Sequence, residues 1–276
     1  MAVSIFDLEK RTDLRKECLR LHEYLSKKIF ILTNDYSVWN NNFWNMVNIC
    51  FTYWPYRYTA LNIQEFFDIH GLPFNVDEMN NEQLLYYLQI ILDFIMWLYT
   101  YDESNPYVEE NKFLSEILYK NEKKLNIIIE NIELTIEQAN YKIEKVDQHY
   151  IFIKRNVDLD SILRQFETKE DIRITLLSYN DFRIEKNIDE KRMILKRLAD
   201  WLEPQKNKFT KIDNQLTNNI FYLLNSIKIR HNNSKQVNLD DDSLLALYDD
   251  LFKMIIHLIR SEDIKRIQSS IQELKQ

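Results

Sequence analysis

Apolar residues recur every three to four positions along most of this chain, which is the spacing of one face of an α-helix. The pattern predicts long helices over residues 6–28, 81–100, 108–140, 216–231 and 242–275, with shorter helical stretches between them. Charged residues fill the other faces of most of these segments, as expected for helices that cover one core. The sequence therefore predicts a mainly α-helical fold, a multi-helix bundle.

One stretch departs from the helical period. Two runs, 141–146 and 149–154, alternate apolar and polar residues across a two-residue polar connection. Strict alternation on both sides of so short a connection is typical of a β-hairpin. We therefore expect an N-terminal helical region at 1–140, a small hairpin seam at 141–156 and a C-terminal helical domain at 157–276.

Local signals mark several helix ends. Asn62 has the side chain of an N-cap, and Gly71 can adopt the left-handed backbone that stops the same helix. His70, next to that stop, suits a helix C-terminus, where the helix dipole favours a cation. Thr168 followed by Asp171 has the spacing of a capping box before another helix. Each of these residues has a structural role that needs no ligand.

The region from Trp39 to Tyr58 is rich in aromatic residues. Aromatic platforms can stack nucleic-acid bases, so this block is one candidate for binding a single strand. However, Trp44, Val47 and Phe51 recur at helical spacing, which favours a buried core. We expect the core interpretation to hold.

Composition narrows the fold and the chemistry further. The chain of 276 residues is 45 % hydrophobic but contains a single glycine and four prolines. One glycine excludes a glycine-rich phosphate loop and a dinucleotide fingerprint, and so few turn residues argue against a sandwich or barrel. The formal net charge of −7 argues against general coating of nucleic acid, although a local basic site remains possible.

Cysteine and histidine placement gives no sign of a metal or cofactor. Cys18 and Cys50 lack metal-type spacing and are expected to be reduced structural thiols. The N-terminus lacks the apolar run of a signal peptide, and no segment is expected to reach the roughly 20 apolar residues of a membrane span. These features predict a cytoplasmic protein without cofactor or metal. The histidines are scattered, with no HxxxH or ExxH pair: His22, His70, His149, His231 and His257.

The segment from Leu216 to Lys235 is the one place where a polar cluster continues an apolar helical face. In the predicted helix, Arg230 and His231 follow Ile227 at the spacing of neighbours on that face. A buried guanidinium needs a partner, which would be an acid, a helix terminus, a ligand or a second subunit. The candidate partners within this domain are Asp240, Asp241, Asp242, Asp249, Asp250, Tyr179 and Asp181.

Two interpretations of this cluster stay open. Arg230 and His231 could stabilise a helix C-terminus, with Asn232 or Asn233 supplying the left-handed residue that ends it. Alternatively, the pair could bind or cleave a ligand. The capping interpretation leaves unexplained why both cations fall on the face that should be driest.

A resemblance favours the second interpretation. Over about residues 125–262, the chain shows a long helix, a hairpin, YNDFR at 179–183, a helix ending in LEP, LLNSIKIRHNN and an apolar final helix. This order resembles the HEPN-type proteins of bacterial abortive-infection and toxin systems. The resemblance implies a C-terminal HEPN-like domain, an antiviral-defence or toxin role, RNA binding with metal-independent endoribonuclease activity, and a homodimer through the C-terminal helices.

Active HEPN ribonucleases use an arginine and a histidine that are separated by four to six residues. This chain has Lys235, Gln236 and Val237 there, but some family members carry a histidine directly after the arginine, as at position 231. The resemblance therefore implies His231 as general acid and base and Arg230 as the group that stabilises the phosphate in the transition state. Supporting or substrate-binding residues would be Asn232, Lys235, Asn225 and Asp181.

The alternative function is a catalytically inactive helical interaction module, acting as a sensor, an antitoxin-like protein or a scaffold partner in a defence system. Lys235 and the net negative charge favour it, because a lysine with a pKa of about 10.4 is a poor acid or base at neutral pH. Arg15 and His22 also satisfy the loose arginine–histidine spacing on an ordinary amphipathic helix. The spacing alone therefore does not identify a catalytic pair.

Overall fold

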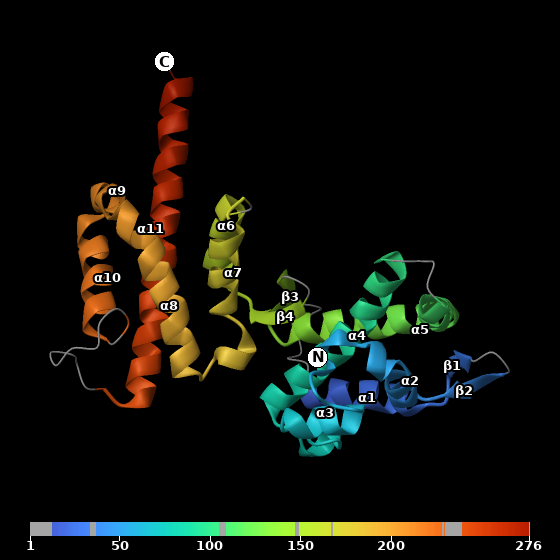
Figure 1. Ribbon diagram of the computed structural model, residues 1–276. Helices are drawn as coiled ribbons and strands as arrows, with labels where there is room; N and C mark the ends of the chain where they lie inside the picture. The colour runs from blue at the N-terminus through green and yellow to red at the C-terminus, as the bar shows by residue number, and fades with distance from the viewer. Residues whose placement is uncertain are drawn as a thin grey trace, which may run out of the picture. The chain divides into compact units, whose positions relative to one another are not determined.

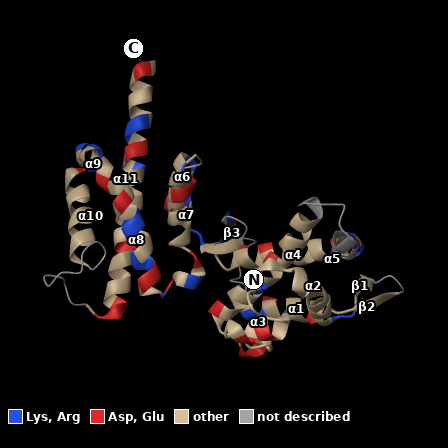
Figure 2. Ribbon diagram, in the orientation of Figure 1, with Lys and Arg blue, Asp and Glu red and all other residues tan. Residues whose placement is uncertain are grey.

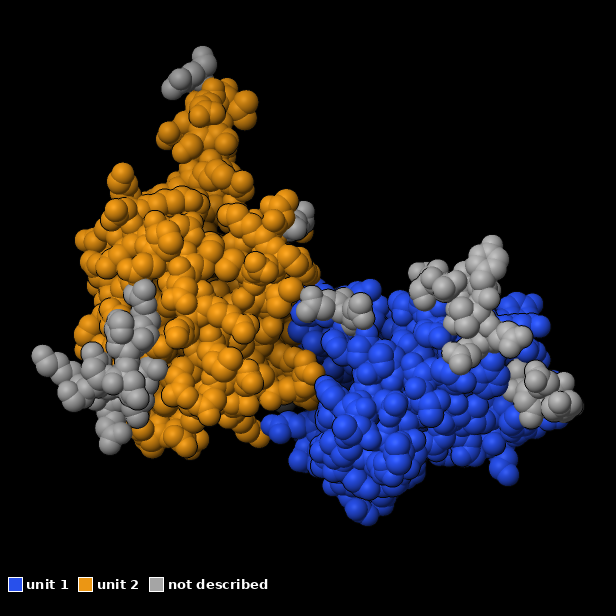
Figure 3. Space-filling model, in the orientation of Figure 1, with its two compact units in different colours: residues 1–152 blue, residues 153–276 orange. Residues whose placement is uncertain are grey.

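The computed structural model describes residues 13–33, 37–104, 109–146, 149–166, 168–227, 229 and 239–275, without the side chains of 33, 102–104 and 109–111. The chain forms two compact units, residues 1–152 and 153–276 (Figure 3). Most described residues are helical, and the strands form two small antiparallel sheets of two strands each (Figure 1). The predicted mainly α fold with a hairpin is confirmed. The boundary between the units lies within the predicted seam at 141–156.

Unit 1 contains five α-helices among its described residues and two hairpins. One hairpin, β3–β4, follows the alternating runs at 141–154 as predicted. The other, β1–β2, was not predicted. The elements are α1 (Leu14–Ser26), β1 (Phe30–Thr33), β2 (Val38–Asn41), α2 (Phe43–Cys50), α3 (Ile63–Ile69), α4 (Asn81–Ser104), α5 (Glu109–Gln138), β3 (Tyr141–Val146) and β4 (His149–Lys154), with 3-10 turns at Phe51–Tyr53, Pro55–Arg57 and Val76–Glu78.

The core of unit 1 is aromatic and is arranged around α4. The ring of Phe94 meets those of Phe43 and Trp54 edge-on, at centroid distances of 6.0 and 5.8 Å. Trp44 is buried and meets Phe67 in the same way at 5.6 Å. Edge-to-face contacts add to the burial of these large rings. The core interpretation of the aromatic block is confirmed for the buried Trp44, Val47 and Phe51, whereas Tyr58 stays exposed.

Helix α4 has the length and apolar composition of a membrane-spanning helix, which no segment of the sequence was expected to have. Residues 81–101 are long and apolar enough, by length and composition alone, to cross a bilayer. The expectation that no segment reaches this length was therefore wrong. Two-thirds of the most apolar part is buried inside the fold, at 67 %. Burial of this kind is typical of a helix at the centre of a core that packs against other elements on several sides.

A buried asparagine joins β1 to α5. The Asn121 side chain accepts a hydrogen bond from the Ile31 N–H at 2.8 Å and donates to the Ile31 carbonyl at 2.7 Å. It also donates to the carbonyl of Ile117, one turn earlier in α5, at 2.8 Å. Asn121 thus satisfies the strand's outward-facing backbone groups in the way that a third strand would.

The predicted caps of α3 are present, but burial lowers the pKa of His70 and so disfavours the cation expected there. Asn62 accepts a hydrogen bond from the Glu65 N–H and caps α3, as predicted. His70 is the C-cap of that helix, and Gly71 follows with φ +63°. Asn140, with φ +65°, takes the same left-handed backbone after α5. Asparagine is among the few residues with a side chain that enter this region readily, so it serves here as a substitute for glycine.

Unit 2 is a bundle of helices closed by the long final helix (Figure 1). The predicted helix at 242–275 is confirmed as one continuous element, and the YNDFR segment interrupts the helices as expected. The elements are α6 (Val157–Leu163), α7 (Glu170–Ser178), α8 (Ile188–Leu202), α9 (Lys206–Ile212), α10 (Asn214–Ser226) and α11 (Asp241–Leu274), with 3-10 turns at Arg164–Phe166, Phe182–Ile184 and Glu203–Gln205.

The apolar faces of α8, α10 and α11 form the core of unit 2. Leu195 and Leu198 of α8 are buried with Ile220 of α10 and Leu251 and Ile255 of α11. Charged side chains lie along α8 and α11, whereas α10 carries none (Figure 2). The periodicity of the sequence predicted the burial of Ile220 and Leu224 in α10, whereas Leu223 is only partly buried.

Some helix starts in unit 2 differ from expectation. Helix α7 begins at Glu170 after Lys169, which makes no side-chain capping bond, so the capping box from Thr168 to Asp171 is wrong. Asn156 and Asn187 cap α6 and α8, where their side chains accept hydrogen bonds from the N–H groups of Leu159 and Glu190. An asparagine oxygen accepts from a free N–H as well as a carboxylate does, and only the backbone geometry decides between neighbouring candidates.

Candidate functional sites

The predicted catalytic cluster follows the end of α10. Arg230, His231, Asn232 and Lys235 lie outside the described residues. The helix that was expected to reach His231 ends at Ser226, and Ile227 has the non-helical angles φ −115° and ψ 44°. The predicted end of this helix near His231 is therefore wrong, and the placement of Arg230 and His231 on its apolar face falls outside the described residues.

The chain leaves α10 from a fixed point. Ile227 is buried, and its carbonyl accepts a hydrogen bond of 3.2 Å from the buried Tyr248 hydroxyl of α11. Ile229, two residues further on, is also buried. Burial of residues 227 and 229 anchors the chain immediately before the RHNNSK segment.

Two of the four predicted supporting residues, Asp181 and Asn225, are described, and they have different surroundings. Asp181 is buried and accepts bonds from the Arg183 guanidinium, including one of 2.5 Å, and from the Arg183 N–H at 2.9 Å. It therefore caps the 3-10 turn at 182–184. Asn225 is exposed on α10, one residue before the helix ends. No hydrogen bond joins Asp181 to Asn225 in the described part of the structure.

The candidate acids of α11 have separate roles. Asp240 is the N-cap and accepts from the Ser243 N–H at 2.9 Å, a bond that lowers the pKa of its carboxyl group. Asp250 pairs with Lys253 on the exposed surface at 3.0 Å. Among these acids, Asp249 meets groups from other helices.

A buried lysine, which sequence reasoning missed, is the centre of that contact. The Lys191 ammonium of α8 is almost fully buried and donates to Asp249 at 2.6 Å, and the Tyr179 hydroxyl donates to the same oxygen at 2.9 Å. Lys191 also lies 5.2 Å from the centre of the Tyr179 ring, which stacks on Phe252 at 3.9 Å. Burial and the Asp249 charge raise the pKa of Tyr179 strongly. This cluster joins α7, α8 and α11, and its groups satisfy one another.

The formal arginine–histidine pair on α1 is structural. The Arg15 guanidinium donates to the carbonyls of Asp77 and Met79 at 2.8 and 2.6 Å. His22 shares a hydrogen bond of 2.8 Å with the buried Tyr87 hydroxyl, and burial lowers the pKa of His22. Across the described part of the chain, no three histidine, cysteine or acidic side chains are grouped so that they could hold a metal ion.

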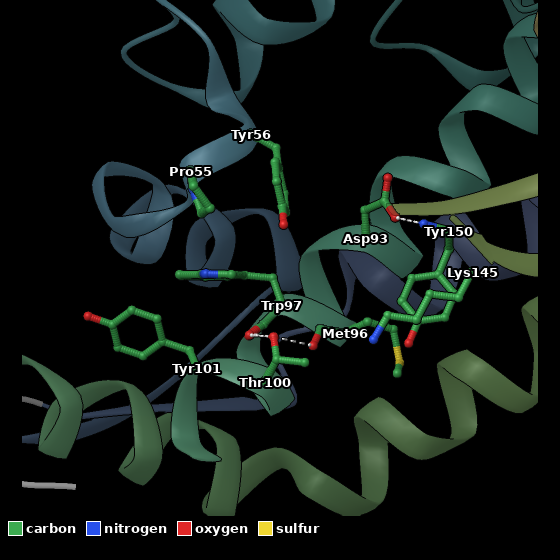
Figure 4. Close-up of a pocket in the computed structure, with 9 residues that line it drawn as sticks. All are labelled: Pro55, Tyr56, Asp93, Met96, Trp97, Thr100, Tyr101, Lys145 and Tyr150. Carbon is green, nitrogen blue, oxygen red and sulfur yellow. Dashed lines mark hydrogen bonds between the residues drawn. The ribbon is translucent and has the colours of Figure 1, made fainter. Parts of the chain in front are cut away.

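Unit 1 contains a pocket of about 400 Å³ that the sequence did not indicate (Figure 4). Figure 4 shows Tyr56 and Trp97 on one side and Tyr150 with Lys145 on the other. Asp93 lies between them and accepts a hydrogen bond of 3.0 Å from the Tyr150 N–H. One face of α4 supplies residues 93, 96, 97, 100 and 101 at helical spacing, and the hairpin β3–β4 faces them.

The pocket combines aromatic walls with one charge of each sign. Burial, and then the Asp93 carboxylate, raise the pKa values of the Tyr56 and Tyr150 hydroxyls. The Lys145 ammonium lies at the exposed rim, 5.9 Å from the centre of the Tyr150 ring. A carboxylate can only accept hydrogen bonds and an ammonium can only donate them, so the pocket offers two complementary polar contacts.

The chain matches no family model, no curated protein and no solved structure. The pocket residues come from three segments, near residue 55, at 93–101 and at 145–150, that no local motif connects. The one feature of the sequence that could have indicated this pocket is Asp93, a charged residue within the most apolar helix of the chain.

Proposed function

We propose that this chain is a helical interaction protein that pairs with a second copy of itself through the end of α11. Four large aliphatic side chains recur there at intervals of three, four and three residues, which is heptad spacing. They stay exposed, by 45 % to 87 % of their surface. These side chains, here called the terminal stripe, are Ile264, Ile267, Ile271 and Leu274.

The body of unit 2 does not cover the terminal stripe. Among the described residues, the last hydrogen bond that joins α11 to another helix is made by Lys265, whose ammonium donates to the carbonyls of Lys211 and Ile212 at the end of α9. Beyond Lys265, the hydrogen bonds and ion pairs of the described α11 residues stay within the helix. Figure 1 shows these last turns extending past the other helices of unit 2.

A second copy fits the pattern of the stripe. When two helices lie antiparallel about Ser269, Ile264 of one faces Leu274 of the other, and Ile267 faces Ile271. Each apolar layer is then filled from both chains, and a two-fold axis relates the two surfaces, as in most homodimers.

The residues that flank the terminal stripe on either side create no charge repulsion between two paired helices. They carry one acid and one base, Asp263 and Lys275, and two neutral residues, Gln268 and Ser270. Like charges at such positions would disfavour self-association, and none face each other here. The interface is small, so we expect a dissociation constant in the range of roughly 1–100 μM.

Sedimentation velocity over that concentration range tests the proposal. The parent chain should change from monomer to dimer, and Ile267→Glu with Ile271→Glu should remain monomeric. The matched control, Ser269→Glu with Gln272→Glu, adds the same charge to the outer face and should still dimerise. A parent chain that stays monomeric, or a control that loses dimerisation equally, would show that the terminal stripe is covered by something other than a second copy.

Disulfide crosslinking tests the antiparallel arrangement. Gln268 lies beside the stripe close to the two-fold axis, so Gln268→Cys should form an intermolecular disulfide under mild oxidation. The native thiols of Cys18 and Cys50 are buried and should not compete. A chain with Ser269→Cys, on the outer face, should crosslink far less.

A second candidate function is metal-independent cleavage of RNA, with Arg230 and His231 as the catalytic pair. The observation that favours it is the anchoring of Ile227 by Tyr248, which fixes the chain three residues before Arg230. Asn232, Lys235 and Asn225 would assist substrate binding. A role for Asp181 is less favoured, because its carboxylate already accepts from Arg183.

Incubation of the purified chain with total RNA in EDTA tests this activity. Arg230→Ala and His231→Ala should each abolish cleavage and growth inhibition, whereas the exposed His257→Ala should leave both unchanged. Cleavage by all three variants at the parental rate would assign any activity to another site or to a contaminant.

Both candidates are compatible with a role in prokaryotic antiviral defence or in a toxin system. The order of helices in residues 125–262 and the RHNNSK signature support this assignment. The two free, buried cysteines support a cytoplasmic location. Loss of phage protection on deletion of the gene, restored by the parent and not by the stripe variant, would connect dimerisation to that role.

A further inference from the structure

We propose that the pocket of unit 1 binds a guanine nucleotide, either as a free mononucleotide or as a guanosine in single-stranded RNA. The proposal rests on neither self-association nor RNA cleavage. It rests on the aromatic walls, the carboxylate of Asp93 and the ammonium of Lys145, which one pocket brings together (Figure 4).

The aromatic side chains favour a flat ligand. Tyr56, Trp97, Tyr101 and Tyr150 all line the same hollow. Stacking of a base on aromatic rings stabilises binding of nucleic acids and is tolerant of the base. The volume of about 400 Å³ lies in the range of roughly 300–1,000 Å³ found for small-molecule sites.

Asp93 selects the edge of the base. A carboxylate only accepts, with about four acceptor positions, so the same group can hold the Tyr150 N–H and a ligand. Guanine presents two neighbouring N–H donors, the ring imino group and the amino group, which match the two oxygens of a carboxylate. Adenine, cytosine and uracil each place an acceptor next to their donor and would direct it at Asp93.

Lys145 supplies the contact for phosphate. Its side chain is exposed at the pocket rim, on the strand opposite Asp93 of α4. An ammonium is a compact positive charge that binds phosphate oxygens. A ligand with a donor edge at one end and a phosphate at the other therefore satisfies both charged groups.

A simpler ligand would be attracted by one of the two charged groups, Asp93 or Lys145, and repelled by the other. An organic cation would be attracted by Asp93 and the rings but repelled by Lys145. A small anion would bind Lys145 but be repelled by Asp93. Neither would use the aromatic walls and both charges together, as a nucleotide does.

Isothermal titration with five probes, GMP, IMP, guanosine, AMP and UMP, tests the assignment. GMP should bind more tightly than IMP, which lacks the amino group, and than guanosine, which lacks the phosphate. We expect each omission to weaken binding about tenfold or more. AMP and UMP should bind still more weakly. Equal affinity for GMP and IMP, or preferred binding of choline or inorganic phosphate, would overturn the proposal.

Two variants assign the contacts within the full chain. Asp93→Asn keeps an oxygen for the Tyr150 N–H and should reduce GMP affinity to that of IMP. Lys145→Gln should reduce it to that of guanosine, while Lys123→Gln, an exposed change of equal charge on α5, should have no effect. Circular dichroism confirms folding, and GMP binding that neither pocket variant alters would refute the assignment.

The source of the guanine is decided by comparing GMP with short oligonucleotides. Oligo(G) that binds at least as tightly as GMP and is weakened by Asp93→Asn would indicate RNA as the ligand. GMP binding without oligo(G) binding would indicate the free nucleotide. Binding of oligo(A) and oligo(G) with equal affinity would contradict recognition by Asp93.

Discussion

Replacement of Asn121 by leucine should destabilise unit 1 specifically. The asparagine amide satisfies the N–H and the carbonyl of Ile31 in β1 and also donates to Ile117. Leucine has a similar size and suits the buried position, but it makes none of these bonds. The Ile31 backbone groups would then face the helix without a partner.

The expected magnitude follows from these two orphaned groups. Each buried polar group without a partner costs about 1–3 kcal/mol, so the pair costs about 2–6 kcal/mol. Burial of the leucine side chain offsets about 2 kcal/mol of this. We therefore expect a net loss of about 2 kcal/mol in the free energy of unfolding.

Urea unfolding followed by tryptophan fluorescence measures this loss, because four of the five tryptophans lie in unit 1. Asn131→Leu is the matched control: Asn131 lies on the same helix and is exposed, so the change should alter the free energy by less than about 0.5 kcal/mol. Equal stability of the Asn121→Leu and Asn131→Leu proteins would refute the role given to the Ile31 backbone groups.

Three further predictions concern unit 1. Burial lowers the pKa values of His22 and His70 below 6.5 in the folded chain, so the unfolded chain takes up protons first and stability should fall as the pH drops from 7.5 to 5.5. Urea midpoints should show this fall, and it should disappear when both residues are changed to glutamine. Burial raises the pKa values of Cys18 and Cys50 to about 12, so a thiol reagent should label the protein only after unfolding; rapid labelling at pH 7.5 would contradict this. Gly71→Ala should cost about 1 kcal/mol, since an added Cβ meets no atom within 4 Å but φ is +63°, and an unchanged thermal midpoint would be inconsistent with backbone strain.

The long helices could be predicted because their pattern extends over many turns. In α5 and α11, apolar residues repeat across 30 and 34 positions, so single exceptions do not change the assignment. The hairpin β3–β4 was predictable from two runs of six residues that flank a short polar connection. Both cases depend on residues that are close in sequence.

The missed hairpin depends on a residue far away. Strands β1 and β2 have four residues each, which is too short for a clear period, and Asn121 completes the bonding of β1 from 90 positions further along the chain. Lys191 was missed for a similar reason, because Asp249, which makes its burial possible, belongs to another helix. Pairwise contacts of this kind leave no trace in local composition.

The early end of α10 shows a limit of periodicity itself. Ile227 and Ile229 are both buried, and the sequence up to Ile227 continues the helical spacing. Helix α10 nevertheless ends at Ser226, where Ile227 takes the non-helical angles φ −115° and ψ 44°, so the predicted helix extended past its true end.

The separation of α11 into a buried part and an exposed terminal stripe has an evolutionary consequence. The buried residues of this helix end at Ile259, and the terminal stripe begins at Ile264. Substitutions in the stripe should therefore leave the stability of the bundle nearly unchanged while altering which helix can pair with it. After gene duplication, two copies of such a chain could acquire separate pairing preferences by a few changes in the last turns, without any change to the rest of the fold.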